Sequence, residues 1–320
     1  VQHGVKIGLR HAQEQTVTVS KVFTVTVKGQ QTNVREQLLA KLDAGFASYG
    51  GLRDAVTGLP LEERDGKYLA ANDIHFPTTR DFGVDGKYTP VTITSSDADT
   101  IVPPDVNNAA RAEVYRPLPG EAAKDVTVTV TITDSDSGVS ASRSFLIAVQ
   151  PLTQAEIDAE LALMAAVKAH YFDGIRNANT DAKNILTDLH PFREAYLDAD
   201  GQLVWVYDHA DLTGSGIVPV AMDGWTESEQ WRLFRSTDPD VISHENLLVT
   251  RAAGDKTVTV SSELSSETLG KYAARYPDNK DFQALSCQPV SVELTVPGTE
   301  PVTPTPVDPT PVEPDHKALS

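Results

Sequence analysis

The amino-acid sequence contains very little cysteine and comparatively little positive charge. Its 320 residues include a single cysteine, Cys287, so no disulfide can form within the chain. The eight histidines are scattered without HxxxH or HxH spacing, which argues against a zinc site. Lys and Arg number 27 against 45 Asp and Glu, giving a formal net charge of −18. Because nucleic acids bind basic surfaces, this balance predicts no nucleic-acid partner.

Long apolar runs are also missing. The longest apolar helical run, residues 161–167, is far shorter than the ~20 residues of a membrane-spanning helix. No secretion signal is visible, and the chain begins at Val1. We therefore interpret it as a fragment of a longer polypeptide, with room for a signal peptide or anchor outside these residues. At roughly 100–200 residues per domain, the length predicts two or three domains.

Three segments have the period-two pattern of a strand with one buried face. They are residues 23–27 (FTVTV), 145–149 (FLIAV) and 292–296 (VELTV). Each has a partner strand upstream, at residues 5–9, 126–133 and 257–260, and residues 134–138 (DSDSG) predict a hairpin turn. We expect one alternate set to face a core: Phe145, Ile147 and Val149, and likewise Val292, Leu294 and Val296.

Two longer regions share an order of motifs. Residues 91–97 (VTITSSD) match residues 232–238 (RLFRSTD), and an apolar residue follows each, Ile101 or Ile242. Residues 114–117 (VYRP) then match residues 249–252 (VTRA), before a glycine-containing loop leads into the paired strands. This order is typical of a β-sandwich.

Each of these regions opens with a predicted helix, at residues 33–42 and 154–170. In the second helix, apolar residues recur at three- and four-residue steps along one face: Ile157, Leu161, Met164 and Val167. Thr153 precedes this run and Glu156 follows three residues later, which is the signature of a capping box. We therefore expect the helix to begin directly after Thr153.

The composition changes at the end of the chain, where residues 298–320 alternate proline with Thr, Val, Asp and Glu. Such a run is an extended, semi-rigid linker. The predicted domains are residues 1–30, the C-terminal strands of a truncated module; residues 31–152 and 153–297, two sandwich modules with helical starts; and the Pro/Thr-rich linker.

Taken together, these motifs resemble the bacterial Ig-like modules called atrophied bacterial Ig domains, over residues 33–150 and 154–297 and the tail of one more module at 1–29. Residues 179–186 (NTDAKNIL) match the Asn-Thr-Asp-type turn of that family. The later module departs at Ala252, where a proline would repeat, and residues 271–284 lengthen its last hairpin. The resemblance implies a mainly β fold of tandem immunoglobulin-like β-sandwiches, each with an N-terminal helical segment. It also implies an extracellular setting and transfers no catalytic residue.

Acidic and aromatic residues supply the candidate binding sites. Residues 198–201 (DADG) and 134–136 (DSD) have the chemistry of calcium loops but lack the full EF-hand spacing. We interpret them as turns, with weak Ca²⁺ binding as the alternative, and expect no other cofactor. Trp225 and Trp231 flank a polar stretch and are candidates for glycan contact, with packing as the alternative. Trp205 lies in a strand-like run and is expected in the core.

No catalytic motif is visible. The Gly-x-Ser-x-Gly pattern is absent, and His75 and His190 stand singly beside apolar residues, so we expect both to be structural. The sequence favours a non-catalytic structural or adhesive stalk of a large bacterial cell-surface protein. The alternative is a set of accessory, carbohydrate-contacting modules of a secreted polysaccharide-degrading enzyme. Expected partners are neighbouring modules of the same chain and a host or cell-wall glycan or protein, and we expect a monomer.

Overall fold

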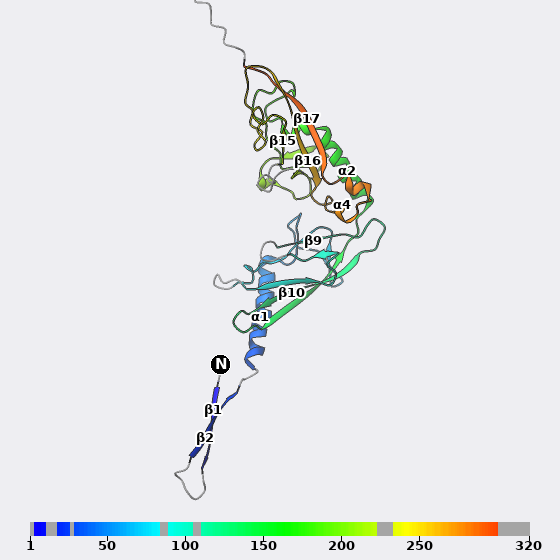
Figure 1. Cartoon of the computed structure of the whole chain (residues 1–320). Coiled ribbons are helices and arrows are strands. Elements are labelled where there is room, and N and C mark those ends of the chain that lie inside the picture. Colours follow the sequence, from blue (N-terminus) through cyan, green and yellow to red (C-terminus); the bar gives the residue numbers. More distant parts are fainter. Residues whose placement is uncertain are drawn as a thin grey trace, which may run out of the picture. The chain divides into compact units, whose positions relative to one another are not determined.

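The structure, a computed structural model, describes residues 3–10, 18–25, 29–83, 89–104, 110–222 and 233–299 (Figure 1). Strands dominate these residues and a few helices lie between them, so the expectation of a mainly β protein is confirmed. The chain divides into two compact units. Unit 1 comprises residues 1–162, 213–216 and 266–283, and unit 2 comprises residues 163–212, 217–265 and 284–320.

Unit 1 contains two larger sheets and a strand pair. The first sheet has the order β4 (Glu63–Arg64), β5 (Lys67–Ala70), β11 (Ser140–Val149), β10 (Lys124–Thr133) and β7 (Val91–Ser95). The second has the order β3 (Arg53–Asp54), β6 (Ile74–His75), β9 (Arg111–Val114) and β8 (Ile101–Val102). Pairing is antiparallel except between β11 and β5, which run parallel. β1 (His3–Arg10) and β2 (Thr18–Val25) pair with each other, as the sequence predicts.

One hydrophobic core joins the two larger sheets of unit 1. Alternate residues of β10 are fully buried, and they meet buried residues from β6, β8 and β9 in the same cluster. The intervening threonines of β10 face water, where their hydroxyls bond serine hydroxyls of β11: Thr129 to Ser144, Thr131 to Ser142 and Thr133 to Ser140. Unit 1 is therefore a two-layer, sandwich-like arrangement whose register follows from the Val/Thr alternation.

The first helix, α1 (Gly29–Tyr49), includes the predicted residues 33–42 and extends beyond both ends. It ends at Tyr49, and the φ of 87° at the following Gly50 is the left-handed conformation that closes many helices. Leu38 and Leu42 enter the core, and Phe46 packs on Phe145 of β11 with ring centroids 4.7 Å apart. No helix in the described ranges is long and apolar enough to cross a membrane.

The predicted inward positions of β11 are confirmed, with one qualification. Ile147 and Val149 are fully buried, while Phe145 is partly buried against the core. The predicted turn between β10 and β11 is also confirmed, because Gly138 adopts φ 69° and its N–H donates to the Asp134 carbonyl at 2.8 Å.

Unit 2 is built on a six-stranded sheet. Its order is β13 (Leu203–Val206), β12 (Glu194–Leu197), β14 (Ile217–Val220), β16 (Lys256–Ser266) and β15 (Arg235–Ser236), and β17 (Gln288–Val296) also pairs with β16. Leu294 and Val296 are buried as predicted, and Val292 is half-buried. α2 (Gln154–Ala169) begins after Thr153 as predicted, and its residues up to Ala162 belong to unit 1. Unit 2 contains the rest of α2 and the short helices α3 (Tyr171–Ile175) and η1 (His209–Asp211).

The connection between β16 and β17 contains the predicted extra residues. They form two short helices, α4 (Tyr272–Arg275) and α5 (Lys280–Gln283), and both belong to unit 1. Tyr272 and Phe282 are the buried residues through which these helices pack, with ring centroids 5.0 Å apart.

The regions matched by sequence make the same local hydrogen bonds. In unit 1, the Ser95 hydroxyl donates to the Asp97 carbonyl, and the Ile101 N–H donates to the same carbonyl at 3.0 Å. In unit 2, Ser236, Asp238 and Ile242 repeat both bonds, the second at 2.9 Å. The strand registers also correspond, because Val128 pairs with Ser95 in the same way as Val260 pairs with Ser236.

Candidate functional site

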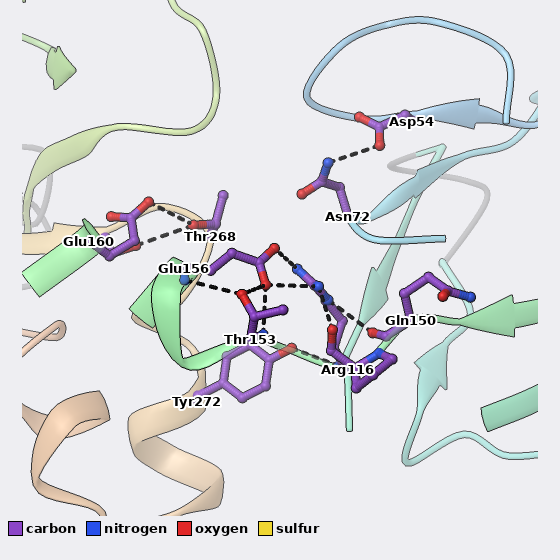
Figure 2. Close-up of polar contacts among 11 residues, drawn as sticks. Asp54, Asn72, Arg116, Gln150, Thr153, Glu156, Glu160, Thr268 and Tyr272 are labelled. Carbon is purple, nitrogen blue, oxygen red and sulfur yellow. Dashed lines mark hydrogen bonds and ion pairs between the residues drawn. The ribbon is translucent and has the colours of Figure 1, made fainter. Parts of the chain in front are cut away.

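The polar contacts centred on Arg116 are the candidate functional site of unit 1 (Figure 2). Arg116 follows β9, and its side chain is only 12% exposed. Its Nε donates to the carbonyl of Gln150 at 3.0 Å and its Nη2 to that of Pro151 at 2.6 Å. These two carbonyls come directly after β11, so one guanidinium fixes the point where the last strand leaves the sheet. The Leu152 N–H adds a bond to the Pro117 carbonyl at 2.8 Å.

The same guanidinium also binds the first turn of α2. Its Nη1 and Nη2 donate to the two oxygens of the Glu156 carboxylate, at 2.9 and 3.2 Å. Glu156 is the acidic member of the predicted capping box, and that box is confirmed. Its Oε2 accepts from the Thr153 N–H and hydroxyl, both at 2.7 Å, and its own N–H donates to the Thr153 hydroxyl at 3.2 Å. One carboxylate therefore caps the helix and binds the arginine.

The electrostatics of Glu156 reflect these contacts. Partial burial by itself raises the pKa of this carboxyl group, but hydrogen bonds from Arg116 and Thr153 favour the charged form and outweigh burial. The pKa of Glu156 consequently lies below its usual range. The ion pair is therefore fully formed at neutral pH.

Arg251 of unit 2 makes the matching contacts. Its Nε donates to the Pro297 carbonyl at 2.9 Å and its Nη2 to the Gly298 carbonyl at 2.7 Å. These carbonyls come directly after β17, as those of Gln150 and Pro151 come after β11. The Thr299 N–H donates to the Ala252 carbonyl at 2.8 Å, which repeats the bond between Leu152 and Pro117. We refer to the arginine and its two carbonyls as the arginine clamp in each unit.

A second polar centre of unit 1 lies at Asp73, whose side chain is 7% exposed. Its carboxylate accepts from the Val114 N–H at 2.7 Å, the Arg111 Nε at 3.0 Å and the Lys271 Nζ at 2.5 Å. Three donors satisfy the charge of this buried acid. Lys271 lies just before α4, so Asp73 holds the α4 segment on the sheet.

Aromatic contacts of unit 1 strengthen the same attachment. The Tyr272 hydroxyl accepts from the Arg116 backbone N–H at 2.6 Å, and burial raises the pKa of Tyr272 to about 12. The Tyr115 ring meets Tyr272 edge-on at 5.5 Å, and the Arg275 guanidinium lies 3.5 Å from the Tyr115 ring centroid. The arrangement joins segments more than 150 residues apart in the sequence. These contacts attach the α4 segment to the end of β9.

No family model matches the chain, and no curated protein matches it. Among solved structures, human protocadherin-24 EC1-2 is 11% identical, and the match covers 67% of this chain and 83% of that chain. Its TM-score of 0.14 is too low to support any argument about this protein.

The predicted site residues have different outcomes. Trp225 and Trp231 lie outside the described residues. The Asp198 carboxylate accepts from the Asp200 and Gln202 N–H groups at 3.0 and 2.8 Å, which is the hydrogen bonding of a turn. Trp205 is half-buried and packs edge-on against Phe192 at 4.8 Å, as expected of a residue that contributes to the core. Across the described ranges, no three His, Cys, Asp or Glu side chains gather where they could hold a metal ion.

The two histidines singled out in the sequence differ. His75 lies in β6, and burial together with the nearby Arg111 lowers its pKa, so its ring is neutral at neutral pH. This agrees with a structural role. His190 is exposed and stacks on Tyr207 in unit 2. Sequence reasoning missed this pair, because a lone histidine next to a proline gives no sign of its ring partner 17 residues away.

Proposed function

We propose that the chain is a non-catalytic structural region, a stalk, of a large bacterial cell-surface protein, built from tandem Ig-like modules. In this proposal it acts outside the cell as a monomer, and its nearest partners are neighbouring modules of the same chain. Its role is to hold a binding head away from the surface.

The recurrence of the arginine clamp is the observation that carries this proposal. Arg116 and Arg251 each bind the two carbonyls that follow the last strand. A module in a stalk must transmit force through its last strand into the next segment. The clamp holds the chain at that exit, and Glu156 connects the clamp of unit 1 to the helix that follows.

Accessory modules of a secreted polysaccharide-degrading enzyme are the second candidate. The pocket beside His190 and Tyr207 favours this function, because aromatic faces with polar edges suit sugar rings. Both candidates share the β-sandwich framework, and a glycan-binding experiment separates carbohydrate-contacting accessory modules from a passive stalk.

Single-molecule stretching tests the stalk directly. The chain is tethered at residues 29 and 299, and the unfolding force of unit 1 is compared between wild type and Arg116→Ala. We expect a lower force in the variant. Arg64→Ala is the matched control, because Arg64 is 64% exposed and forms an ion pair with Glu62, which is 60% exposed. Equal forces in all three proteins would remove the main support for the stalk.

Two further measurements test the class of function. Antibodies against the purified chain should label intact cells of the source organism. Labelling of lysed cells alone would contradict a surface location. Screens for glycosidase and peptidase turnover should show no activity, and reproducible turnover would contradict the non-catalytic proposal.

A further inference from the structure

Unit 2 contains a cavity of about 670 Å³ that the clamp does not use. Its floor is apolar, formed by Leu189, Phe192 and Phe234, all of which are buried. Its rim is polar and exposed, and includes His190, Arg193 and Asn246. An apolar floor under a few convergent polar groups is the usual construction of a small-molecule site.

The His190 and Tyr207 rings form a fixed platform at this cavity. They stack with centroids 4.5 Å apart and planes 16° from parallel. The Tyr207 hydroxyl donates to the Gly174 carbonyl at 3.1 Å, and the backbone N–H of His190 donates to the Ile175 carbonyl at 2.9 Å. Tyr207 is half-buried while His190 is exposed, so the Tyr207 ring is held by the protein and the His190 ring meets solvent.

The charges of the rim limit the ligand class. Arg193 and Glu245 carry opposite charges, and Asn177 and Asn246 supply neutral amides. The pocket therefore has no excess of one charge to attract an ion, and the net charge of −18 disfavours anionic ligands. Amides and charged groups of both signs can donate to and accept from hydroxyl groups.

We propose that this pocket binds a neutral saccharide, with the C–H face of one sugar ring on the His190–Tyr207 stack and its hydroxyls bonded to the rim. The inference goes beyond the stalk: it adds glycan adhesion to unit 2. It does not depend on the clamp, because none of the pocket residues takes part in it.

An NMR titration with neutral cello-, xylo-, manno- and chito-oligosaccharides at millimolar concentration tests this proposal. At least one series should shift the amide resonances of Leu189, His190 and Asn246. His190→Ala should weaken binding about tenfold, equivalent to ~1.4 kcal/mol. Asn246→Ala should weaken it less. His209→Ala is the matched control, since His209 is an exposed histidine of the same unit outside the pocket, and its binding should equal that of wild type.

Three outcomes would overturn the proposal. The first is that no neutral series shifts the pocket resonances. The second is that only acidic oligosaccharides bind and that Arg193→Gln abolishes this binding. The third is that His190→Ala binds like wild type while Trp225→Ala or Trp231→Ala does not. The unfolding force of unit 1 should be unchanged by pocket variants, because the pocket residues belong to unit 2, so failure here is separable from failure of the stalk.

Discussion

Arg116 of unit 1 and Arg251 of unit 2 make the same two backbone hydrogen bonds in different surroundings. Arg116 also binds Glu156, and its backbone N–H donates to the Tyr272 hydroxyl. Arg251 is exposed, and its contacts are to the carbonyls of Pro297 and Gly298. The two bonds to carbonyls, which both units share, hold the end of the last strand. The additional bonds to Glu156 and Tyr272 attach α2 and α4 to the clamp of unit 1.

This difference shows how one local motif can serve two purposes. A guanidinium presents five N–H donors in a planar fork, so two can hold carbonyls while others bind a carboxylate. Arg116 of unit 1 uses both sets of donors, and the carboxylate that the second set binds also caps α2. The comparison predicts that equivalent substitutions in the two clamps have unequal effects.

The largest effect is expected from Arg116→Ala. Loss of the bonds to two carbonyls and to Glu156 should destabilise unit 1 by about 2–3 kcal/mol, a range discounted because Glu156 is partly exposed. The free energy of unfolding, obtained from urea titration with hydrogen exchange of the Leu152 amide as a local probe, measures this loss. Arg64→Ala should change stability by less than ~0.5 kcal/mol, as expected for an exposed surface residue.

Tyr272→Phe should have the next largest effect. The substitution keeps the ring but removes the hydroxyl that accepts from the Arg116 N–H, at a cost of about 1–2 kcal/mol for a partly buried donor. Exchange of the Arg116 amide hydrogen should accelerate accordingly. Tyr276→Phe removes a hydroxyl from the neighbouring stacked ring and serves as control. An unchanged rate in Tyr272→Phe would show that this bond adds nothing to the clamp.

Arg251→Ala should cost less, about 1 kcal/mol, because its hydrogen bonds are exposed to water. The effect should appear as faster amide exchange at Thr299. A loss equal to that of Arg116→Ala would contradict the asymmetry between the two clamps, and would assign the stabilisation to the shared carbonyl contacts alone.

The smallest effect concerns pH and Asp97. A hydrogen bond from Lys124 is the main cause that lowers the pKa of Asp97 to about 2. Because the folded pKa is below the unfolded value, the stabilisation is complete above about pH 4 and is lost as pH falls toward 2. Solvent screening keeps it below about 1 kcal/mol. Melting temperatures between these pH values should fall less steeply for Asp97→Asn than for wild type.

The elements that rest on local signals could be predicted from the sequence. The Val/Thr alternation of β10 predicts the strand and its buried face, and Thr153 with Glu156 predicts the start of α2. The matched segments around Ser95 and Ser236 were also found, since equal spacing produces equal local hydrogen bonds. The tandem Ig-like organisation itself stays a prediction.

The partners of the clamp could not be predicted in the same way. Arg116 and Arg251 lie in matched motifs, but the carbonyls they bind are 34 to 47 residues away in sequence. The bond from Arg116 to Tyr272 spans 156 residues, and it depends on where α4 packs. Neither follows from periodicity or spacing. The pocket was missed for the same reason, because its walls come from separate segments of unit 2.

The alternation of buried valines and outward-facing threonines in β10 determines where this protein can accept inserted residues. An insertion within β10 would shift every following side chain by one position, placing Thr129 and Thr131 toward the core and their valine neighbours in water. The turn at residues 134–138 carries no such constraint, because its side chains are exposed or half-exposed. Inserted peptides should therefore be tolerated at that turn and should disrupt the strands on either side.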